Sequence, residues 1–310
     1  MKIIYDLKEL KKPLNHPVLT IGNFDGVHRG HLTLFDKVKK IAKAINGQSA
    51  VMTFEPHPIK VMKPGNGPPL ITPINQKLKL IVDVGIDVIF CIPFTTQFAS
   101  ISAQDFVRNI LVDIIGIREI VVGYDYTFGS KRLGDIKLLR EMGNELGFKV
   151  HVMEPIHLNS TLVSSTYIRD LVREGNLAEA KRMLGRDYQI SGIVTKGADR
   201  GGKILGFPTA NMMPVDELIP KNGVYAVLVE MEEGSFYGVC NIGHNPTFGH
   251  NPRSIETHLL NFNRNILGKE FNVKFLHRLR DEKTFKGKDE LADQIRQDVK
   301  KARELFGLHE

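Results

Sequence analysis

The stretch Gly22-Asn23-Phe24-Asp25-Gly26-Val27-His28-Arg29-Gly30-His31 decides the interpretation of the first half of the chain. It follows a short apolar run, Val18–Ile21, and precedes an amphipathic run, Leu32–Ile45. This order predicts a strand, a glycine-rich turn and the start of a helix. Such a turn lets backbone N–H groups and a helix N-terminus approach an anion. His28 and His31 are expected on nearly the same helical face, so the stretch suits a bound polyphosphate.

The first half of the chain alternates short apolar runs with amphipathic runs. The runs expected as strands are Val18–Ile21, Ala50–Phe54, Val88–Ile92, Ile120–Gly123 and Val150–Met153. The runs expected as helices are Leu32–Ile45, Asn75–Val84, Ala103–Ile115, Asp135–Leu146 and Ser165–Glu174. This alternation predicts an α/β fold, a doubly wound parallel sheet covered by helices on both faces. Ligands of such sheets bind beyond the carboxyl ends of the strands, where the Gly22 turn and Gly123 both lie.

After a further expected helix, Leu177–Leu184, the pattern changes to short strands separated by Gly, Pro and Asn. The expected strands are Tyr188–Thr195, Gly223–Glu230, Phe236–Asn241, Ile255–Leu260 and Phe271–Leu276. One long helix, Lys288–Phe306, follows them. The second half is therefore expected to be a small antiparallel β-barrel closed by a C-terminal helix. The predicted domains are residues 1–184 and 185–310.

Composition limits the class of protein. The chain has 310 residues, 42% of them hydrophobic, and its apolar runs are too short to span a membrane. Charged residues interrupt the N-terminal segment, so no signal peptide is expected. Cys91 and Cys240 have no zinc-site spacing and are expected to be buried. A reducing, cytoplasmic compartment is predicted, with no membrane partner. The net charge of +7 admits anionic partners, but the basic residues are dispersed, which favours small anionic ligands over nucleic acid. The sequence leaves the oligomeric state open.

A second element of the first half supports a phosphate site. Ser164-Ser165-Thr166-Tyr167-Ile168-Arg169 begins an expected helix with hydroxyl groups and an arginine, whose fork suits phosphate. Taken alone it would be an ordinary N-cap, and the two histidines could be polar caps. A zinc interpretation of the histidines lacks further ligands. Together, the elements resemble the HxGH nucleotidyltransferase superfamily, whose members join a nucleoside triphosphate to an acceptor and release pyrophosphate.

Two further stretches narrow this resemblance. They are Phe54-Glu55-Pro56-His57-Pro58 and Gly123-Tyr124-Asp125-Tyr126-Thr127-Phe128-Gly129, which singly would be loops with packed aromatic residues. In this order, the motifs resemble the adenylyltransferase module of the prokaryotic bifunctional riboflavin kinase/FMN adenylyltransferase (FAD synthetase) family over Met1 to Leu184. Tyr126 replaces the family's usual Phe, and Leu162-Val163 is a second mild departure. The resemblance implies ATP and phosphate binding by Gly22, Asn23, Phe24, Asp25, Gly26, His28, His31, Ser164, Ser165, Thr166 and Arg169. It implies flavin binding by Phe54, Pro56, His57, Pro58, Asp125, Tyr126 and Phe128.

The second half carries its own motifs. Gly202-Lys203-Ile204-Leu205-Gly206-Phe207-Pro208-Thr209-Ala210-Asn211 joins a glycine-rich loop to neutral oxygen ligands that suit Mg²⁺ beside phosphate. The expected strand Ile255–Leu260 places Glu256, His258 and Leu260 on one face, where composition alone would favour a solvent-facing Glu256. The two motifs resemble the riboflavin kinase fold, a six-stranded barrel, over about Asp187 to Glu310. The resemblance implies that Glu256 is the general base and that Thr209 and Asn211 hold Mg²⁺. ATP and flavin would bind at Gly202, Gly206, Pro208, Thr209, Asn211 and Glu256.

The resemblance implies two reactions in series. The barrel would phosphorylate riboflavin with ATP to give FMN, and the α/β domain would join AMP from a second ATP to FMN, giving FAD and pyrophosphate, with Mg²⁺ as cofactor. His28 and His31 would be the catalytic residues of the second step, which needs charge stabilisation more than a base. The alternatives are a single-activity enzyme whose other domain only binds ligand, and a flavin- or nucleic-acid-binding regulator. A class I tRNA synthetase is disfavoured because the chain is short and lacks a Lys-Met-Ser-Lys-Ser-like loop.

Overall fold

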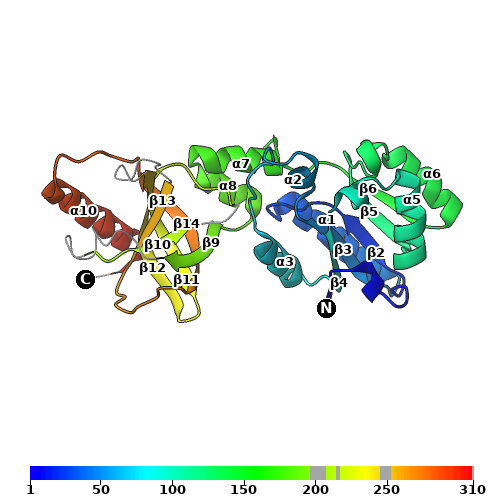
Figure 1. Cartoon of the computed structure of the whole chain (residues 1–310), viewed down its shortest axis with the longest axis horizontal. Helices are drawn as coiled ribbons and strands as arrows, with labels where there is room; N and C mark the ends of the chain where they lie inside the picture. The colour runs from blue at the N-terminus through cyan, green and yellow to red at the C-terminus, as the bar shows by residue number, and fades with distance from the viewer. Residues whose placement is uncertain (196–206, 214–216, 245–252, 309–310) are drawn as a thin grey trace. The chain divides into compact units, whose positions relative to one another are not determined.

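The structure, a computed structural model, describes residues 1–195, 207–213, 217–244 and 253–308 (Figure 1). By packing, the chain divides into two units, Met1–Ser165 and Thr166–Glu310. The first contains a parallel sheet and the second a closed barrel. The helices α7 (Ser165–Glu174) and α8 (Leu177–Leu184) precede the predicted boundary. However, α8 packs against two barrel strands, β9 (Tyr188–Thr195) and β14 (Glu270–Arg280).

The sheet of the first unit has six parallel strands in the order β1-β4-β3-β2-β5-β6. The order reverses between β2 and β5, so the turn after β2 lies at a topological switch point, where ligands of such sheets bind. β1 was not predicted, because three residues are too few to show a strand pattern. The strands are β1 (Lys2–Ile4), β2 (Val18–Ile21), β3 (Ser49–Glu55), β4 (Val88–Pro93), β5 (Glu119–Gly123) and β6 (Lys149–Met153).

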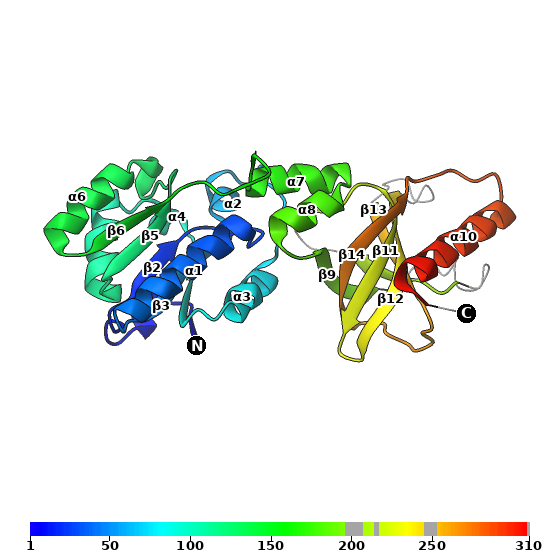
Figure 2. The same cartoon turned by 180° about the vertical axis from the view of Figure 1, so that it is seen from behind.

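Helices cover both faces of this sheet, which confirms the doubly wound α/β prediction (Figure 2). On one face, α1 and α3 bury a core that includes Phe35, Val51 and Ile81. On the other, α6 and the helical segment 103–115 bury a larger core around Met52 and Leu111. The helices and short pairs are η1 (Leu7–Glu9), α1 (Arg29–Ala44), α2 (Pro58–Met62), α3 (Ile74–Asp83), α4 (Thr96–Ala99), α5 (Ala103–Asp105), η2 (Phe106–Ile115), η3 (Ser130–Arg132), α6 (Ile136–Leu146), β7 (His157–Leu158) and β8 (Thr161–Leu162).

Two helix predictions need correction. α1 begins at Arg29 and not at Leu32, because His28 is its N-cap and the motif itself forms the first turn. The predicted helix 103–115 is a short α-turn followed by a π-helix, η2, that ends at Gly116 in the left-handed conformation. Hydrophobic periodicity places a helix correctly, but it does not reveal which backbone groups bond at its ends.

The second unit is a closed antiparallel barrel with the cyclic strand order β10-β13-β12-β11-β14-β9. This confirms the expected six-stranded barrel, and side chains such as Tyr225, Cys240 and Phe275 fill its interior. β10 was not predicted as a strand, since it coincides with the Thr-Ala-Asn stretch that was interpreted only as a ligand loop. The elements are β9 (Tyr188–Thr195), β10 (Ala210–Met213), β11 (Gly223–Met231), β12 (Gly234–His244), β13 (Arg253–Leu259), β14 (Glu270–Arg280) and α10 (Lys288–Phe306).

Two sequence-level expectations about class can be compared with the structure. Cys91 and Cys240 are buried free thiols, as predicted, and burial raises the pKa of Cys240 to about 12. Among the helices of the described ranges, none combines the length and the apolar character needed to cross a membrane.

The C-terminal helix is fixed to the barrel by an ion pair as well as by apolar packing. Arg280 at the end of β14 donates from Nε to both carboxylate oxygens of Asp298 at 3.0 Å and from an Nη to Oδ2 at 2.8 Å. The exposed fractions of the two side chains are 16% and 6%. Beside them, Ala302 of α10 packs on Val224, Val239 and Leu279. The pair therefore orients α10 over one outer face of the barrel.

Replacing Asp298 with Ala should destabilise the barrel by about 3 kcal/mol, because the partly buried Arg280 guanidinium loses a buried carboxylate partner. Hydrogen exchange of the barrel amides would measure the change in the free energy of unfolding. Asp293→Ala is the matched control, since Asp293 pairs with Arg296 on the exposed side of the same helix and should contribute less than about 1 kcal/mol. Equal losses in the two variants would contradict this assignment.

Candidate active sites

The turn after β2 has a strained backbone. Phe24, Gly26 and Val27 have φ angles of +48°, +88° and +39°. Two of these residues are not glycine, and positive φ is costly for residues with a Cβ. Such a conformation persists only when surrounding contacts hold it, so the hydrogen-bond partners of this turn show which residues fix its shape.

Hydrogen bonds from segment 70–73 hold the turn in place. The buried Asp25 carboxylate accepts from the backbone N–H of Ile71 at 3.0 Å and of Thr72 at 3.1 Å. The Thr72 hydroxyl accepts from the Gly26 N–H at 3.0 Å. The Asp25 side chain thus positions the turn from within the protein.

The two histidines stack at the start of α1. Their ring centroids are 3.6 Å apart with an interplanar angle of 19°. His28 is the N-cap, and its Nδ1 accepts from the His31 N–H at 3.4 Å. A Cβ at Gly30 would lie 3.1 Å from the His28 ring, so glycine permits this packing. Both rings therefore stand at a positive helix end, as the spacing predicted.

The serine stretch reaches the same turn. Ser165 Oγ donates to the Asp25 carbonyl at 2.9 Å, across 140 positions of sequence. Ser164 immediately precedes it, and Thr166 follows it in α7. Arg169 is buried on α7, with an exposed fraction of 8%.

A chain of aromatic rings joins the two stretches expected to bind flavin. Phe54 contacts Phe98 at 5.7 Å between centroids, Phe98 contacts Phe106 at 6.1 Å, and Phe106 contacts Phe128 at 6.0 Å. Tyr126 stacks on Phe128 at 5.5 Å. Rings from β3, α4, η2 and the loop after β5 thus form one aromatic cluster, in which Phe54, Phe106 and Phe128 belong to the buried core. The sequence motifs identified the two ends of this cluster.

The remaining residues of these stretches have distinct settings. The Glu55–Pro56 peptide bond is cis. His57 caps α2, with its Nδ1 accepting from the Ile59 N–H at 3.3 Å, and Pro58 is the first residue of that helix. Asp125 is exposed.

Three polar residues of this site were missed by the sequence interpretation. Thr72 holds Gly26, Thr53 donates from Oγ1 to the Asn23 carbonyl at 3.2 Å, and Lys77 is buried beneath the turn. A signal for Lys77 was present, because it lies four residues before the buried Ile81 and hence on the apolar stripe of α3. Thr53 and Thr72 have no such signal.

In the barrel, strand register aligns the kinase residues predicted from the second half. Asn211 on β10 and Asn241 on β12 are the cross-strand partners of Glu256 on β13. Cross-strand partners face the same side, about 5 Å apart at Cβ. Ile255, Thr257 and Leu259 are buried, so Glu256 and His258 occupy the opposite face of β13. Leu260, expected on the same face, lies past the end of the strand.

The register also identifies Asn241, which the sequence interpretation treated only as the end of a strand. Asn211 and Asn241 flank Glu256 on both sides, so two carboxamides border its carboxylate. Thr209 and Pro208 precede β10, and the Pro208 carbonyl is 2.9 Å from Nδ1 of His258. Gly202 and Gly206 lie outside the described residues.

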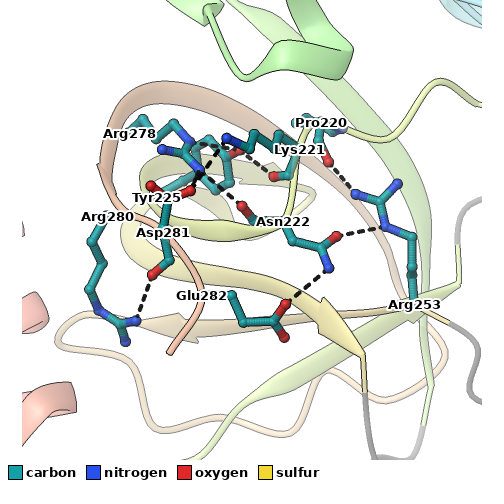
Figure 3. A network of polar contacts seen from close by, with 9 residues as sticks. All are labelled: Pro220, Lys221, Asn222, Tyr225, Arg253, Arg278, Arg280, Asp281 and Glu282. Atoms are coloured by element: carbon teal, nitrogen blue, oxygen red, sulfur yellow. Dashed lines mark hydrogen bonds and ion pairs between the residues drawn. The ribbon is translucent and has the colours of Figure 1, made fainter. Parts of the chain in front are cut away.

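A network of polar contacts holds the end of the barrel where β13 begins (Figure 3). Its centre is Asn222, whose Oδ1 accepts from Arg253 Nε at 2.9 Å and whose Nδ2 donates to Glu282 at 3.0 Å. The Asn222 carbonyl accepts from Arg278 at 3.0 Å, and Arg278 also bonds Asp281 at 2.8 Å. Because Arg253 is three residues before Glu256, this network fixes the strand that carries the expected base.

An apolar pocket of about 530 Å³ adjoins the strand that carries Glu256. Pro208 and His258 are among its lining residues. Pro208 directly precedes Thr209, and His258 is two residues after Glu256. The other lining residues are Phe207, Leu259, Leu260, Asn261, Phe262, Asn263, Val299 and Arg303. Phe207 packs edge-on against His258 at 5.3 Å. The mixture of aromatic, apolar and amide groups that line the pocket suits a planar heterocycle.

Comparisons with known proteins agree with both halves. The family model described as FAD synthetase matches residues 10–167, and the one described as riboflavin kinase matches residues 184–306. Similar curated proteins are bifunctional riboflavin kinase/FMN adenylyltransferases. One from Buchnera aphidicola subsp. Schizaphis graminum is 38% identical over 99% of this chain and 100% of its own. One from Escherichia coli strain K12 is 37% identical over 99% of both.

One solved structure is similar over nearly the whole chain. A crystal structure described as a macrolide-efflux protein from Streptococcus pneumoniae superposes with a TM-score of 0.85 and 30% identity, over 97% of this chain and 98% of that one. The shared feature is the two-part architecture, and the family matches show the activities.

The fold and the two sites define a two-domain, ATP-dependent transferase with a nucleotidyltransferase half and a kinase half. The chain belongs to the bifunctional riboflavin kinase/FMN adenylyltransferase family. Its activities are the ATP-dependent conversion of riboflavin to FMN and of FMN to FAD.

Replacing Thr72 with Val should lower FMN adenylyltransferase activity by a factor of about 5 to 100 and leave riboflavin kinase activity unchanged. The substitution removes the hydrogen bond that the Thr72 hydroxyl accepts from the Gly26 N–H, a loss of about 1–3 kcal/mol that acts on the strained turn. Parallel assays of FAD formation from FMN and of FMN formation from riboflavin measure both outcomes.

Thr20→Val is the matched control. Thr20 is a fully buried threonine on β2 whose hydroxyl has no hydrogen-bond partner within the described part of the chain. The same substitution there should leave both activities unchanged. An equal loss of FAD formation in both variants would show that the effect is one of general packing.

Proposed function

We propose that the two activities are divided between the domains, with FMN adenylylation in residues 1–184 and riboflavin phosphorylation in residues 185–310. The family matches support this division, since each falls within one of these ranges apart from the first residue of the second match. The geometry of each motif supports the proposed residue roles. His28 and His31 stack at the start of α1, and Glu256 is paired in register with Asn211.

In the barrel, Glu256 is the proposed general base. It accepts the proton of the ribityl 5′-hydroxyl, whose oxygen attacks the γ-phosphorus of ATP as the bond to ADP breaks. Asn211 and Asn241 orient the carboxylate from both sides. The planar ring of a substrate binds in the pocket beside Pro208 and His258, which places the reacting groups next to Glu256.

Thr209 and Asn211 are the proposed Mg²⁺ ligands of the barrel. Their neutral oxygens fit an ion that takes few protein ligands and several phosphate oxygens. Among the described residues, there is no cluster of three or more His, Cys, Asp or Glu side chains that could hold a metal. A bound Mg²⁺ would neutralise phosphate charge, and Gly202 and Gly206 are proposed to contribute to ATP binding.

In the first domain, an FMN phosphate oxygen attacks the α-phosphorus of a second ATP, and the bond to pyrophosphate breaks. The nucleophile is already an anion, so the principal obstacle is charge repulsion. His28 and His31 donate hydrogen bonds to the triphosphate, with the amides of residues 22–26 around it. Ser164, Ser165, Thr166 and Arg169 form the second phosphate clamp, and the flavin ring packs at the aromatic cluster that runs from Phe54 to Tyr126.

The proposed compartment is the cytoplasm, and the small-molecule partners are ATP, riboflavin and FMN. The two buried free thiols support this, since thiols stay reduced there.

The two sites should be separable by substitution. Glu256→Gln is expected to lower FMN formation from riboflavin by a factor of about 10²–10⁴ and to leave FAD formation from supplied FMN unchanged. Replacing both His28 and His31 with Ala should have the converse effect. Product analysis with each flavin, ATP and Mg²⁺ measures both reactions.

Glu270→Gln is the charge-matched control, because Glu270 is an exposed residue at the start of β14. It should leave both reactions unchanged. If Glu256→Gln also abolished FAD formation from FMN, the division of sites would be wrong. A single-activity enzyme predicts one product only, and a ligand-binding regulator predicts neither.

A further inference from the structure

A buried lysine lies beneath the turn of the adenylyltransferase site. Lys77 is on α3, and its exposed fraction is 5%. Burial lowers the pKa of Lys77, while the nearby charges of Glu55 and Asp25 oppose that shift. A buried ammonium group is costly unless its donors are used. The partners of Lys77 therefore show why this position holds a lysine.

The Lys77 ammonium donates to two backbone carbonyls. The distances from Nζ are 3.2 Å to the Asn23 oxygen and 3.4 Å to the Phe54 oxygen. Asn23 follows β2 and belongs to the turn proposed to bind ATP. Phe54 is near the end of β3 and begins the stretch proposed to bind flavin. One side chain thus connects the two loops that would carry the two substrates.

A neighbouring lysine shows that α3 does not require a buried one. Lys79 lies on the same helix, with a side chain that is 75% exposed and paired with Asp83. A lysine that served only helix stability would extend to solvent in this way. The inward position of Lys77 corresponds to its bonds at the carboxyl ends of β2 and β3.

We propose that Lys77 is a positioning residue of FMN adenylylation, which holds the ATP turn and the flavin-binding stretch in one relative geometry. The inference rests on the proposed residue roles in the first domain. It requires that loss of the Lys77 ammonium weakens both substrates, although the side chain touches neither.

The decisive measurement is the KM for each substrate of the FMN adenylyltransferase reaction in the full chain. Lys77→Met, which keeps the length and removes the donors, should raise the KM for ATP and the KM for FMN about tenfold each. A tenfold change is within what hydrogen bonds to a charged group contribute. Lys77→Gln retains amide donors without the charge and should give intermediate values. It carries the comparison if the Met variant does not fold.

Thr53→Val separates this role from simple support of the turn. Thr53 donates to the same Asn23 carbonyl, so its loss should raise the KM for ATP and leave that for FMN within twofold. Lys79→Met is the matched lysine control and should leave both KM values within twofold. The riboflavin kinase activity of each variant reports the integrity of the other domain.

Two outcomes overturn different conclusions. If the His28 and His31 double variant still forms FAD normally, the proposed site is wrong. If that variant is inactive but Lys77→Met keeps both KM values within twofold and loses only thermal stability, Lys77 is structural and the positioning role is wrong. A rise in one KM alone would also contradict the link between the loops.

Discussion

The adenylyltransferase half depends on one interaction, the acceptance of two backbone N–H groups by the buried Asp25 carboxylate. Segment 24–27 has a backbone conformation that residues with a Cβ avoid, so the turn would relax without an external constraint. The Asp25 carboxylate supplies this constraint by accepting the N–H groups of residues 71 and 72. Thr72 and Ser165 add hydrogen bonds to the neighbouring backbone. The consequence is a fixed helix start at which His28 and His31 stack.

Strand register has the corresponding role in the barrel. A shift of one residue would turn Glu256 from the outer face to the interior, because side chains alternate along a strand. The pairing with β10 and β12 fixes the register and places Asn211 and Asn241 beside it. The network around Asn222 anchors the start of β13 (Figure 3). The Arg280–Asp298 pair anchors α10 on the outer face. Strand pairing and the polar network at the start of β13 therefore determine how Asn211, Glu256 and Asn241 lie beside one another.

The two sites differ in the chemistry that they must supply. A ribityl hydroxyl must lose a proton as it attacks, and the proposed base in the barrel is the carboxylate of Glu256. The phosphate of FMN is already charged, and the proposed site in the α/β domain offers donors, a helix N-terminus and aromatic rings. The product of the first reaction is the nucleophile of the second, which gives the presence of both domains in one chain a chemical rationale.

The sequence by itself determined the two fold classes and most element positions, because periodicity and turn residues are local signals. It also located the motifs of both sites, since each is a continuous stretch. The tertiary structure decided what joins those stretches: Thr72 and Ser165 at the Gly22 turn, Phe98 and Phe106 between the aromatic stretches, and Asn241 beside Glu256. These contacts link residues far apart in the chain, and no local pattern encodes them. Lys77 is the intermediate case, since its place on an apolar stripe was visible but the two carbonyls that it binds were not.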